Sequence, residues 1–339
     1  MHEPLITLYR ATFGEDPHSV VPLNAHASNR RMFRLFGSER SVIGIANPNR
    51  FENRAFVEFS EHFKNVGLPV PEIYGVDLDL GIYLEEDLGD STLYDALSAA
   101  RTESDPFPAA IEQLYVEAVA LLTRFQIVAG ASLNYDFCHP RRSYDRESML
   151  WDMHFFRESF VRRAGVAFDE ARLESDFERL TDFLAGAPTG FFMYRDFQSR
   201  NIMVRNGALF FIDYQGGRKG PLQYDVASLL YQAKAKIPAE ARRRILEAYL
   251  LAASRYAPID RVRFQEHFYG FVLVRLLQVL GTYGEQGLHL KKPYFVESIP
   301  PALRNLRALS GDTPLLGELP EFERIVDVLC EMYLAEERG

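Results

Sequence analysis

The stretch MYRDFQSRNIMVRNGALFFIDYQG (residues 193–216) contains two short apolar runs, 202–205 and 208–212, that are rich in residues favouring β-strands. The dipeptide Asn206-Gly207 between them is a strong signal for a two-residue hairpin turn, because both residues tolerate a positive φ. The stretch therefore predicts a β-hairpin.

Three oxygen-bearing side chains gather at the open end of this predicted hairpin. A two-residue turn pairs Asn201 with Ile212, so Asp213 lies one residue beyond the partner of Asn201. In a regular pleat Asn201 and Asp213 would point to opposite faces, and the ladder must therefore loosen if both are to hold one ion. Asp196 precedes this end by five residues, close enough to curl over the same place. Burying charge among apolar residues is costly unless something compensates it, so the set indicates a functional site.

The chemistry of these ligands favours a hard cation. Carboxylate and amide oxygens without imidazole or thiolate suit Mg²⁺, which keeps several waters and takes only one or two protein carboxylates plus substrate phosphate oxygens. Asn201 and Asp213 fit that demand. Asp196 is then left to accept a proton from a substrate hydroxyl.

Length and composition predict a protein of two lobes or two domains. The chain has 339 residues, 47% of them hydrophobic and 25% charged, which is ordinary for a globular protein. The net charge of −9 argues against a general nucleic-acid binder, although it leaves room for a local basic pocket.

The expected location is the cytoplasm, with no membrane partner. Cys138 and Cys330 are far apart and suggest neither a disulfide framework nor a zinc site. The N-terminus lacks the basic and apolar pattern of a signal peptide. The most apolar stretch, 271–280, is interrupted by Arg275 and is too short to span a bilayer.

The first 88 residues predict a small sheet that carries one helix. Phe56, Phe59, Phe63 and Val66 recur at helical spacing, and the sequence GLPVP that follows ends that helix. We expect the helix over 51–66 and strands at 19–23, 31–36, 41–47, 73–78 and 81–86.

The remainder predicts a larger, mostly helical lobe with the hairpin embedded in it. Apolar residues at helical spacing predict helices around 114–130, 148–163, 170–185, 222–235, 239–255 and 264–281, the first of them closed by Gly130. The predicted fold class is α+β, with an N-terminal lobe at 1–88, a hinge at about 83–90 and a helical lobe at 89–339.

The motifs around the predicted hairpin resemble those of a known superfamily. YRDFQSRN (194–201) fits the kinase catalytic-loop frame of an aspartate followed five positions later by an asparagine, and IDYQ (212–215) fits the metal-binding aspartate after the hairpin. The sequence is similar to the aminoglycoside phosphotransferase and choline kinase superfamily, whose fold is protein-kinase-like and bilobal. Further resemblance lies in ASNRRMFRL (27–35), GLPVPEI (67–73), YLEEDLGD (83–90), FIDYQGGRKGPLQYDVASLL (211–230) and RLLQVLGTYG (275–284). It is strongest to the bacterial branch that phosphorylates N-acetylmuramate and N-acetylglucosamine at the anomeric hydroxyl.

The resemblance implies roles for the residues of the hairpin site. Asp196 would be the catalytic base or the group that orients the acceptor hydroxyl. Asn201 and Asp213 would hold Mg²⁺ on the phosphates of ATP. Asp225, in QYDVASLL, would brace the catalytic loop through hydrogen bonds.

The resemblance also implies where the nucleotide binds. Ser28, Asn29 and Arg31 lie where a phosphate-covering turn belongs, and their side chains are suitable phosphate donors. The hinge carries Glu85 and Asp87 as candidate nucleotide contacts. Because adenine is normally read there by main-chain groups, these two side chains need not matter individually.

The chain departs from the kinase pattern in its N-terminal lobe. The predicted strand at 41–47 has no lysine for the nucleotide phosphates, and the ordinary Gly-rich loop is missing. Arg31 or Arg34 would then supply the positive charge, unless the nucleotide is held differently. The helix glutamate that would pair with such a cation is ambiguous between Glu52 and Glu58.

The acceptor site is the least determined part. In the family, helices near 148–163 wall this pocket, which makes Trp151, Asp152 and Arg157 candidate acceptor contacts. Core packing is the alternative for Trp151. Arg275 lies in an apolar helix and is a further candidate, with a structural salt bridge to a buried acid as its alternative.

The predicted function is an ATP- and Mg²⁺-dependent phosphotransferase that acts on a hydroxyl of a small molecule, with an amino sugar as the leading acceptor. Aminoglycosides are disfavoured because a polycation calls for a densely acidic wall, whereas residues 140–165 mix several arginines with acids. Choline is also disfavoured, although aromatic residues are available for a cation cage. One alternative is a nucleotide-binding regulatory module that lost turnover, suggested by the missing lysine. Another is a metal-dependent phosphohydrolase, although the chain has no histidine between His154 and His267.

Overall fold

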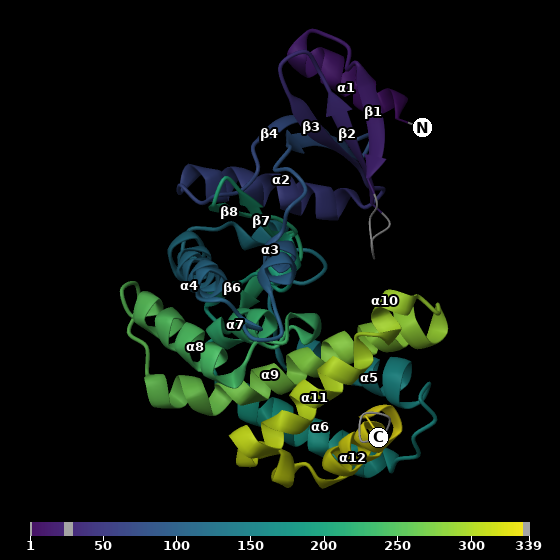
Figure 1. The fold of residues 1–339 in the computed structure, drawn as a ribbon, viewed down its shortest axis with the longest axis vertical. Helices are drawn as coiled ribbons and strands as arrows, with labels where there is room; N and C mark the ends of the chain where they lie inside the picture. The colour runs from purple at the N-terminus through teal and green to yellow at the C-terminus, as the bar shows by residue number, and fades with distance from the viewer. Residues whose placement is uncertain (1, 24–29, 335–339) are drawn as a thin grey trace.

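The computed structural model describes residues 2–23 and 30–334, which form a small sheet lobe above a larger helical lobe (Figure 1). The sheet is antiparallel throughout, in the order β1-β2-β3-β5-β4. Its strands are β1 (Ser19–Leu23), β2 (Arg31–Phe36), β3 (Ser41–Ala46), β4 (Ile73–Asp77) and β5 (Ile82–Glu86). All five predicted strands are confirmed to within one residue at each end.

Helix α2 (Arg50–Asn65) confirms the predicted helix and its termination signal. Gly67 takes a left-handed φ of 71°. The backbone N–H of Gly67 donates to Lys64 at 2.9 Å, and that of Leu68 donates to Phe63 at 2.9 Å. These two bonds form the Schellman motif that satisfies the last carbonyls of a helix.

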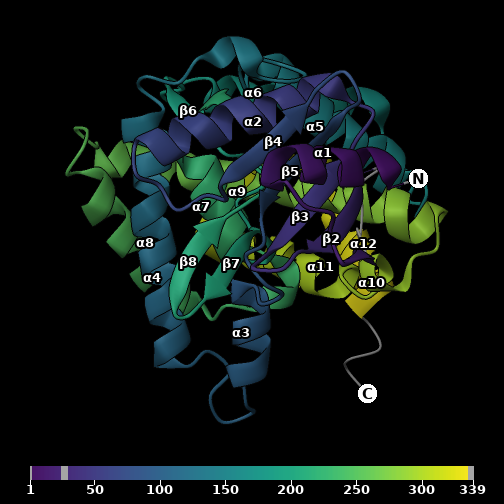
Figure 2. The ribbon, with the colours of Figure 1, turned by 90° about the horizontal axis from the view of Figure 1, so that it is seen from above.

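Helix α1 (Glu3–Phe13), which the sequence analysis did not predict, covers the outer face of the sheet (Figure 2). Its Leu5 and Tyr9 pack on outward-facing strand residues that include Leu35, Val42 and Leu84. Because successive strand residues alternate between faces, the other face of the sheet is turned toward α2 and the lower lobe.

The inner face joins the main hydrophobic core of the molecule. The ring of Phe56 on α2 stacks on Tyr83 of β5, with 5.3 Å between ring centroids, and on Tyr214 at 4.9 Å. Tyr214 directly follows Asp213, so aromatic packing fixes α2 over the end of the hairpin.

The lower lobe is helical, and each of the six predicted helical ranges contains a helix. Its helices are α3 (Leu93–Ala100), α4 (Ala109–Thr123), α5 (Arg146–Phe156), α6 (Glu170–Leu184), α7 (Leu222–Leu230), α8 (Ala239–Ala253), α9 (Arg261–Tyr283), α10 (Pro293–Val296), α11 (Ile299–Asp312) and α12 (Pro320–Leu334). Helix α7 ends at Leu230, five residues earlier than predicted. Helices α3, α10, α11 and α12 add to the predicted set. No helix among the described residues is long and apolar enough to cross a lipid bilayer.

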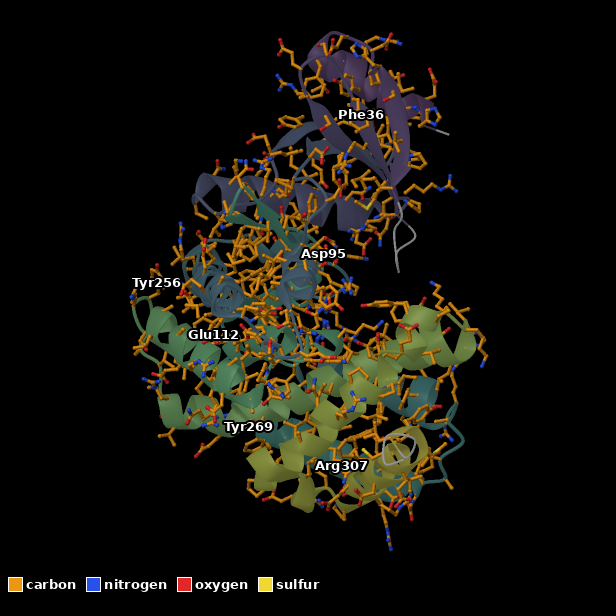
Figure 3. The ribbon with its side chains drawn as sticks, viewed as in Figure 1. Phe36, Asp95, Glu112, Tyr256, Tyr269 and Arg307 are labelled. Atoms are coloured by element: carbon orange, nitrogen blue, oxygen red, sulfur yellow. The ribbon has the colours of Figure 1, made fainter. Side chains whose placement is uncertain are left out.

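Side chains tie these helices together across the lobe. Glu112, labelled on α4 in Figure 3, accepts two hydrogen bonds from Arg244 on α8, both at 2.7 Å. The pair links two helices that lie side by side at one edge of the lower lobe in both ribbon views (Figures 1 and 2).

Gly130 does not end the helix as a left-handed cap, the role predicted from the sequence. After α4 the chain continues as a π-helical turn (Arg124–Ala129), and Gly130 itself has a helical φ of −59°. A Cβ atom at Gly130 would lie 2.9 Å from atoms of Phe192. Glycine is therefore needed here for close packing rather than for a left-handed cap.

The predicted hairpin is confirmed, with β7 (Ile202–Arg205) and β8 (Ala208–Phe211) in the expected register. Beyond the last strand pair, the backbone N–H of Ile212 donates to the carbonyl of Asn201 at 3.1 Å. The flanking strands β6 (Phe191–Met193) and β9 (Arg218–Gly220) pair with each other and were not predicted.

Candidate active site

Two left-handed residues shape the end of the hairpin. Arg195 has a φ of 80° and Asp213 a φ of 68°, conformations that cost a residue with a Cβ about 1–2 kcal/mol. A regular strand would send Asn201 and Asp213 to opposite faces. The reversal at Asp213 brings its Oδ2 to 3.3 Å from Nδ2 of Asn201. This is the loosening of the ladder that the sequence required.

The amide of Asn201 is oriented by the catalytic loop itself. Its Nδ2 atom donates to the backbone carbonyl of Asp196 at 2.9 Å. Because the nitrogen is used in this way, Oδ1 is the atom of the amide left to act as a metal ligand. The side chain of Asp196 is 42% exposed, which leaves it accessible to an incoming molecule.

The environment of Asp213 favours a bound cation. Its Oδ1 accepts hydrogen bonds from Gln215 at 2.7 Å and from Arg30 at 3.1 Å. Burial raises the pKa of Asp213, the positive charge of Arg30 opposes this rise, and the negative charge of Asp196 adds to it. A divalent cation between the oxygens of Asn201 and Asp213 would offset both the burial and the repulsion, so the donor set fits Mg²⁺.

Arg275 holds the carboxylate of Asp196. It projects from α9 with its side chain only 5% exposed, and its Nη2 atom lies 3.3 Å from Oδ1 of Asp196. Its Nη1 donates to Gln278, and its guanidinium lies 5.8 Å from the ring centroid of Tyr224. The partner of this buried arginine is therefore the candidate catalytic acid, whose side chain is half-exposed rather than buried as expected.

Asp225 lies under the catalytic loop. Fully buried in α7, it accepts hydrogen bonds from the backbone N–H groups of Tyr194 at 2.7 Å and Arg195 at 2.9 Å. Gln126 donates a third bond to the same carboxylate at 2.9 Å. Burial raises the pKa of Asp225 to about 6, although these hydrogen bonds lower it. The bonds hold the two residues before Asp196 in place, including the left-handed one.

The structure corrects the place expected for Asp152. Its side chain is fully buried and forms two hydrogen bonds with Arg195, at 2.7 and 2.8 Å. Tyr144 donates a third bond to it at 2.7 Å. Because these partners surround the carboxylate, Asp152 braces the catalytic loop through Arg195 and cannot contact an acceptor.

The other two candidates on and after α5 have different environments. Trp151 is 58% exposed and stacks on Phe155, with 5.5 Å between ring centroids, so the core-packing alternative does not hold. Arg157 is bound by Glu158 at 2.7 Å and by Glu174 at 3.0 Å. These acids neutralise Arg157, which leaves the exposed Trp151–Phe155 stack as the better candidate for an acceptor wall.

A family model described as the phosphotransferase enzyme family matches residues 19–264, more than half of the chain. The chain belongs to this phosphotransferase family.

The phosphotransferase is similar over most of its length to an N-acetylmuramate/N-acetylglucosamine kinase from Pseudomonas aeruginosa. The two are 26% identical over 313 residues, which cover 90% of this chain and 88% of the relative.

Solved structures show the same fold. One is a choline kinase from Cryptosporidium parvum, with a TM-score of 0.63, 12% identity, and coverage of 93% of this chain and 98% of the other. Another is an amicoumacin kinase in complex with AMP-PNP, Ca²⁺ and Ami, with a TM-score of 0.60, 12% identity, and coverage of 92% and 94%. The predicted superfamily, the kinase-like α+β fold and the assignment as a small-molecule kinase are confirmed.

The segment predicted to cover the nucleotide phosphates, 28–31, is only partly described. Ser28 and Asn29 lie outside the described residues, and Arg31 begins β2 with an exposed side chain. At the predicted hinge, Asp87 is bound by Arg34 at 2.7 Å, so its carboxylate is occupied by an ion pair.

Glu85 carries a titratable carboxyl group inside the phosphotransferase. It is 8% exposed, and its Oε2 atom has no hydrogen-bond partner among the described residues. Burial raises the pKa of Glu85 to about 8, the charge of Arg30 opposes this, and Asp213 adds to it. Between the ordinary value of 4.5 and this raised value, the folded chain holds a proton that the unfolded chain releases.

We expect Glu85→Gln to make the stability of the phosphotransferase less dependent on pH. The free energy of unfolding of the wild type should fall as pH rises from about 4.5 to 8, since a tenfold difference in proton affinity between the folded and unfolded chains corresponds to about 1.4 kcal/mol. Urea denaturation at pH 5 and pH 8.5 should show the two proteins similar at pH 5 and the variant more stable at pH 8.5. An equal difference at both pH values would contradict this assignment.

Several residues that contribute to the site were not predicted individually, among them Arg30, Gln126, Tyr144, Arg195 and Gln215. Gln215 follows Asp213 by two residues, but the left-handed φ of Asp213 breaks the alternation of an extended chain, so this spacing was not a reliable signal. Arg30 lies within ASNRRMFRL (27–35), which the resemblance already marked as the region of a phosphate-covering turn, whereas Tyr144 comes from a distant segment for which the sequence offered no signal.

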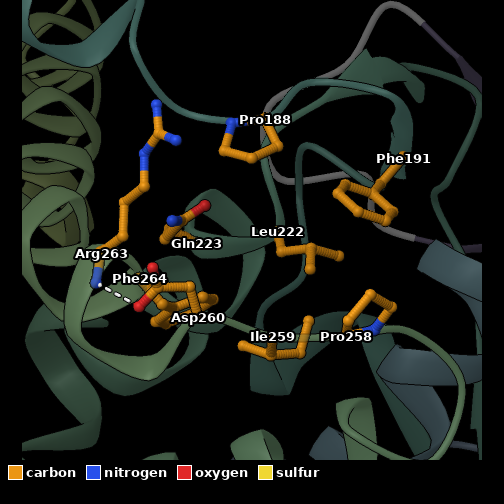
Figure 4. Close-up of a pocket in the computed structure, with 9 residues that line it drawn as sticks. All are labelled: Pro188, Phe191, Leu222, Gln223, Pro258, Ile259, Asp260, Arg263 and Phe264. Atoms are coloured by element: carbon orange, nitrogen blue, oxygen red, sulfur yellow. Dashed lines mark hydrogen bonds between the residues drawn. The ribbon is translucent and has the colours of Figure 1, made fainter.

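A small cavity elsewhere in the lower lobe is not a second candidate for the active site. It has a volume of about 70 Å³ and is lined mainly by residues at the starts of α7 and α9 (Figure 4). Ligand pockets usually measure about 300–1,000 Å³. Its described lining residues, which include Leu222, Asp260 and Arg263, contain none of the catalytic-loop set.

Proposed function

We propose that the chain transfers the γ-phosphoryl group of ATP to a hydroxyl of a sugar, with Mg²⁺ as the metal. The observation that supports this most is the convergence of Asp196, Asn201 and Asp213 at the end of the hairpin, with 3.3 Å between the side chains of Asn201 and Asp213. When bound, Mg²⁺ would supply charge neutralisation on the nucleotide phosphates.

The residues of the chain have distinct tasks in this proposal. Oδ1 of Asn201 and the carboxylate of Asp213 would hold the metal. Asp196, oriented by Arg275 at 3.3 Å, would accept the hydroxyl proton of the acceptor and align the oxygen for attack. Phosphoryl transfer depends on positioning and charge neutralisation more than on covalent chemistry, so the tasks assigned to these groups match what the reaction needs.

We propose an amino sugar of the N-acetylmuramate or N-acetylglucosamine kind as the acceptor, phosphorylated at the anomeric hydroxyl. The relative from Pseudomonas aeruginosa carries both sugars in its name and covers 90% of the chain. An anomeric hydroxyl ionises more readily than an ordinary alcohol, so a single carboxylate such as Asp196 is a sufficient base. The exposed Trp151 offers an aromatic face of the kind that sugars stack on.

A product analysis tests this proposal. The protein is incubated with ATP, Mg²⁺ and one acceptor at a time, and the product is located by ³¹P and ¹H NMR. The acceptors are N-acetylglucosamine, N-acetylmuramate, glucose, choline, kanamycin and the 1-O-methyl glycoside of N-acetylglucosamine. We expect a phosphate coupled to the anomeric proton of the free amino sugars, and no product from the methyl glycoside.

The panel also separates the alternatives. Phosphorylation of the methyl glycoside would move the reaction to another hydroxyl. Choline or kanamycin as the sole substrate would refute an N-acetylated amino sugar as the acceptor. Release of inorganic phosphate from ATP without any acceptor product would favour a phosphohydrolase instead.

A further inference from the structure

The inner face of β3 cannot supply the cation that kinases place there. In protein kinases a lysine on this strand contacts the nucleotide phosphates and pairs with a glutamate on the following helix. Here the inward-facing residues of β3 are Ile43 and Ile45, both buried in the main core. A phosphate-binding cation must therefore come from another part of the chain.

Arg34 is one of the two arginines that the sequence suggested as the phosphate-binding cation, but its charge is neutralised by two acids at the predicted hinge. It is bound by Asp87 at 2.7 Å and by Asp90 at 2.8 Å, with its own side chain 14% exposed. The other, Arg31, has an exposed side chain at the first position of β2. Arg30, which precedes Arg31, is better placed than Arg31 or Arg34 to bind the phosphates of a nucleotide.

Arg30 lies in the required position. Its side chain is 15% exposed, and its Nη1 atom is 3.1 Å from Oδ1 of Asp213. Its Nη2 atom is 3.7 Å from Oε2 of Glu52 on α2. One guanidinium thus spans the helix glutamate and the candidate metal ligand, the two groups that flank the lysine in a kinase. The pairing also resolves the choice between Glu52 and Glu58, because Glu58 lies 3.7 Å from Arg54 instead.

Glu52 is itself held in place. Asn47 donates to its Oε2 atom at 2.9 Å, and its backbone N–H donates to the side chain of Asn49, which caps α2. A fixed acid on α2 gives Arg30 an anchor that does not depend on Asp213. Arg30 can therefore exchange the carboxylate of Asp213 for a phosphate while it remains paired with Glu52.

We propose that Arg30 takes the place of the missing lysine and binds the phosphates of the nucleotide, with Glu52 as its anchor. This inference rests on the proposed function. A guanidinium suits the task because its planar fork of donors matches two phosphate oxygens at once.

The test compares nucleotides that differ only in their phosphates. Affinities of the wild type, Arg30→Met and Arg30→Lys for ADP and adenosine are measured by calorimetry, with and without Mg²⁺. We expect Arg30→Met to weaken ADP binding about 10- to 100-fold, the range for charge-assisted hydrogen bonds, and to leave adenosine binding unchanged. Arg30→Lys should recover part of the loss, because it keeps the charge without the fork.

Two further variants keep the test decisive. Arg40→Met removes a half-exposed arginine from the turn between β2 and β3, and it should bind ADP as the wild type does. Glu52→Gln keeps the Arg30 side chain but removes the ion pair that anchors it to α2. It should weaken ADP binding and not adenosine binding, and it serves if Arg30→Met does not fold.

The outcomes separate this inference from the proposed function. Wild-type affinity for ADP in Arg30→Met would overturn the role of Arg30 alone, as would a larger loss in Arg31→Met than in Arg30→Met. Tighter ADP binding by Arg30→Met would show that Arg30 blocks the site. If the wild type binds no nucleotide, the inference and the proposed function both fail.

Discussion

Replacing Asp196 with asparagine should lower the turnover number by about 10²- to 10⁴-fold, the usual contribution of a positioned acid or base. Asparagine keeps the shape of the side chain and its contact with Arg275, but it cannot accept the proton of the acceptor hydroxyl. The measurement is the steady-state rate of ADP formation with saturating ATP, Mg²⁺ and the best acceptor of the panel. Nucleotide affinity should change little, because Asp196 is not among the proposed metal ligands.

The control for this prediction is Asp182→Asn. Asp182 lies on α6 with its side chain 66% exposed and pairs with Arg146, so the same chemical change there should leave turnover intact. Turnover of Asp196→Asn within a few-fold of the wild type would rule out a proton-accepting role.

Replacing Asp213 with asparagine should remove most of the metal-dependent activity, with a loss of turnover on the order of 10²-fold or more at ordinary Mg²⁺ concentrations. The change exchanges a charged metal ligand for a neutral one, and metal ions contribute several kcal/mol of charge stabilisation to such reactions. Turnover is measured as a function of Mg²⁺ concentration, and binding of Mn²⁺ in the presence of ADP is followed by electron paramagnetic resonance.

The Mg²⁺ dependence of turnover and the Mn²⁺ affinity should both change in the Asp213 variant. More Mg²⁺ should be needed for half-maximal turnover, and the Mn²⁺ affinity should fall. The variant Asp182→Asn again serves as the control. A variant that loses turnover but binds Mn²⁺ as tightly as the wild type would show that Asp213 acts through folding or loop position rather than as a ligand.

The sequence was most informative where structure is decided locally. The turn residues Asn206-Gly207 set the hairpin register, which predicted that Asn201 and Asp213 lie next to each other at its open end; the left-handed φ of Asp213, which brings their side chains together, was not predicted. The helix over 51–66 and its end at Gly67 followed from apolar spacing and from the left-handed preference of glycine.

The sequence signals of helix α1 lie at its two ends. Pro4 in its first turn and Gly14 just after its end, with a φ of 77°, are both typical helix boundaries. Only two of its residues, Leu5 and Tyr9, are buried, and two positions spaced four apart do not make a periodic apolar pattern that predicts a helix.

Contacts between distant segments could not be predicted from the sequence. Arg275 and Asp196 are 79 residues apart, and Arg30 and Asp213 are 183 apart. Each pair depends on how the helices and the sheet pack, which no local pattern encodes. The same limit applies to Asp152, because a polar residue on an apolar helix face suggests a pocket or a buried ion pair equally well.

The measurement that tests the central claim most directly is a crystal structure of the protein with AMP-PNP and Mg²⁺. We predict a metal ion about 2.1 Å from Oδ1 of Asn201 and from a carboxylate oxygen of Asp213, bridging to phosphate oxygens. Asp196 should face the γ-phosphate from the side open to an acceptor. A metal held by other residues, or a nucleotide bound away from the end of the hairpin, would contradict the account.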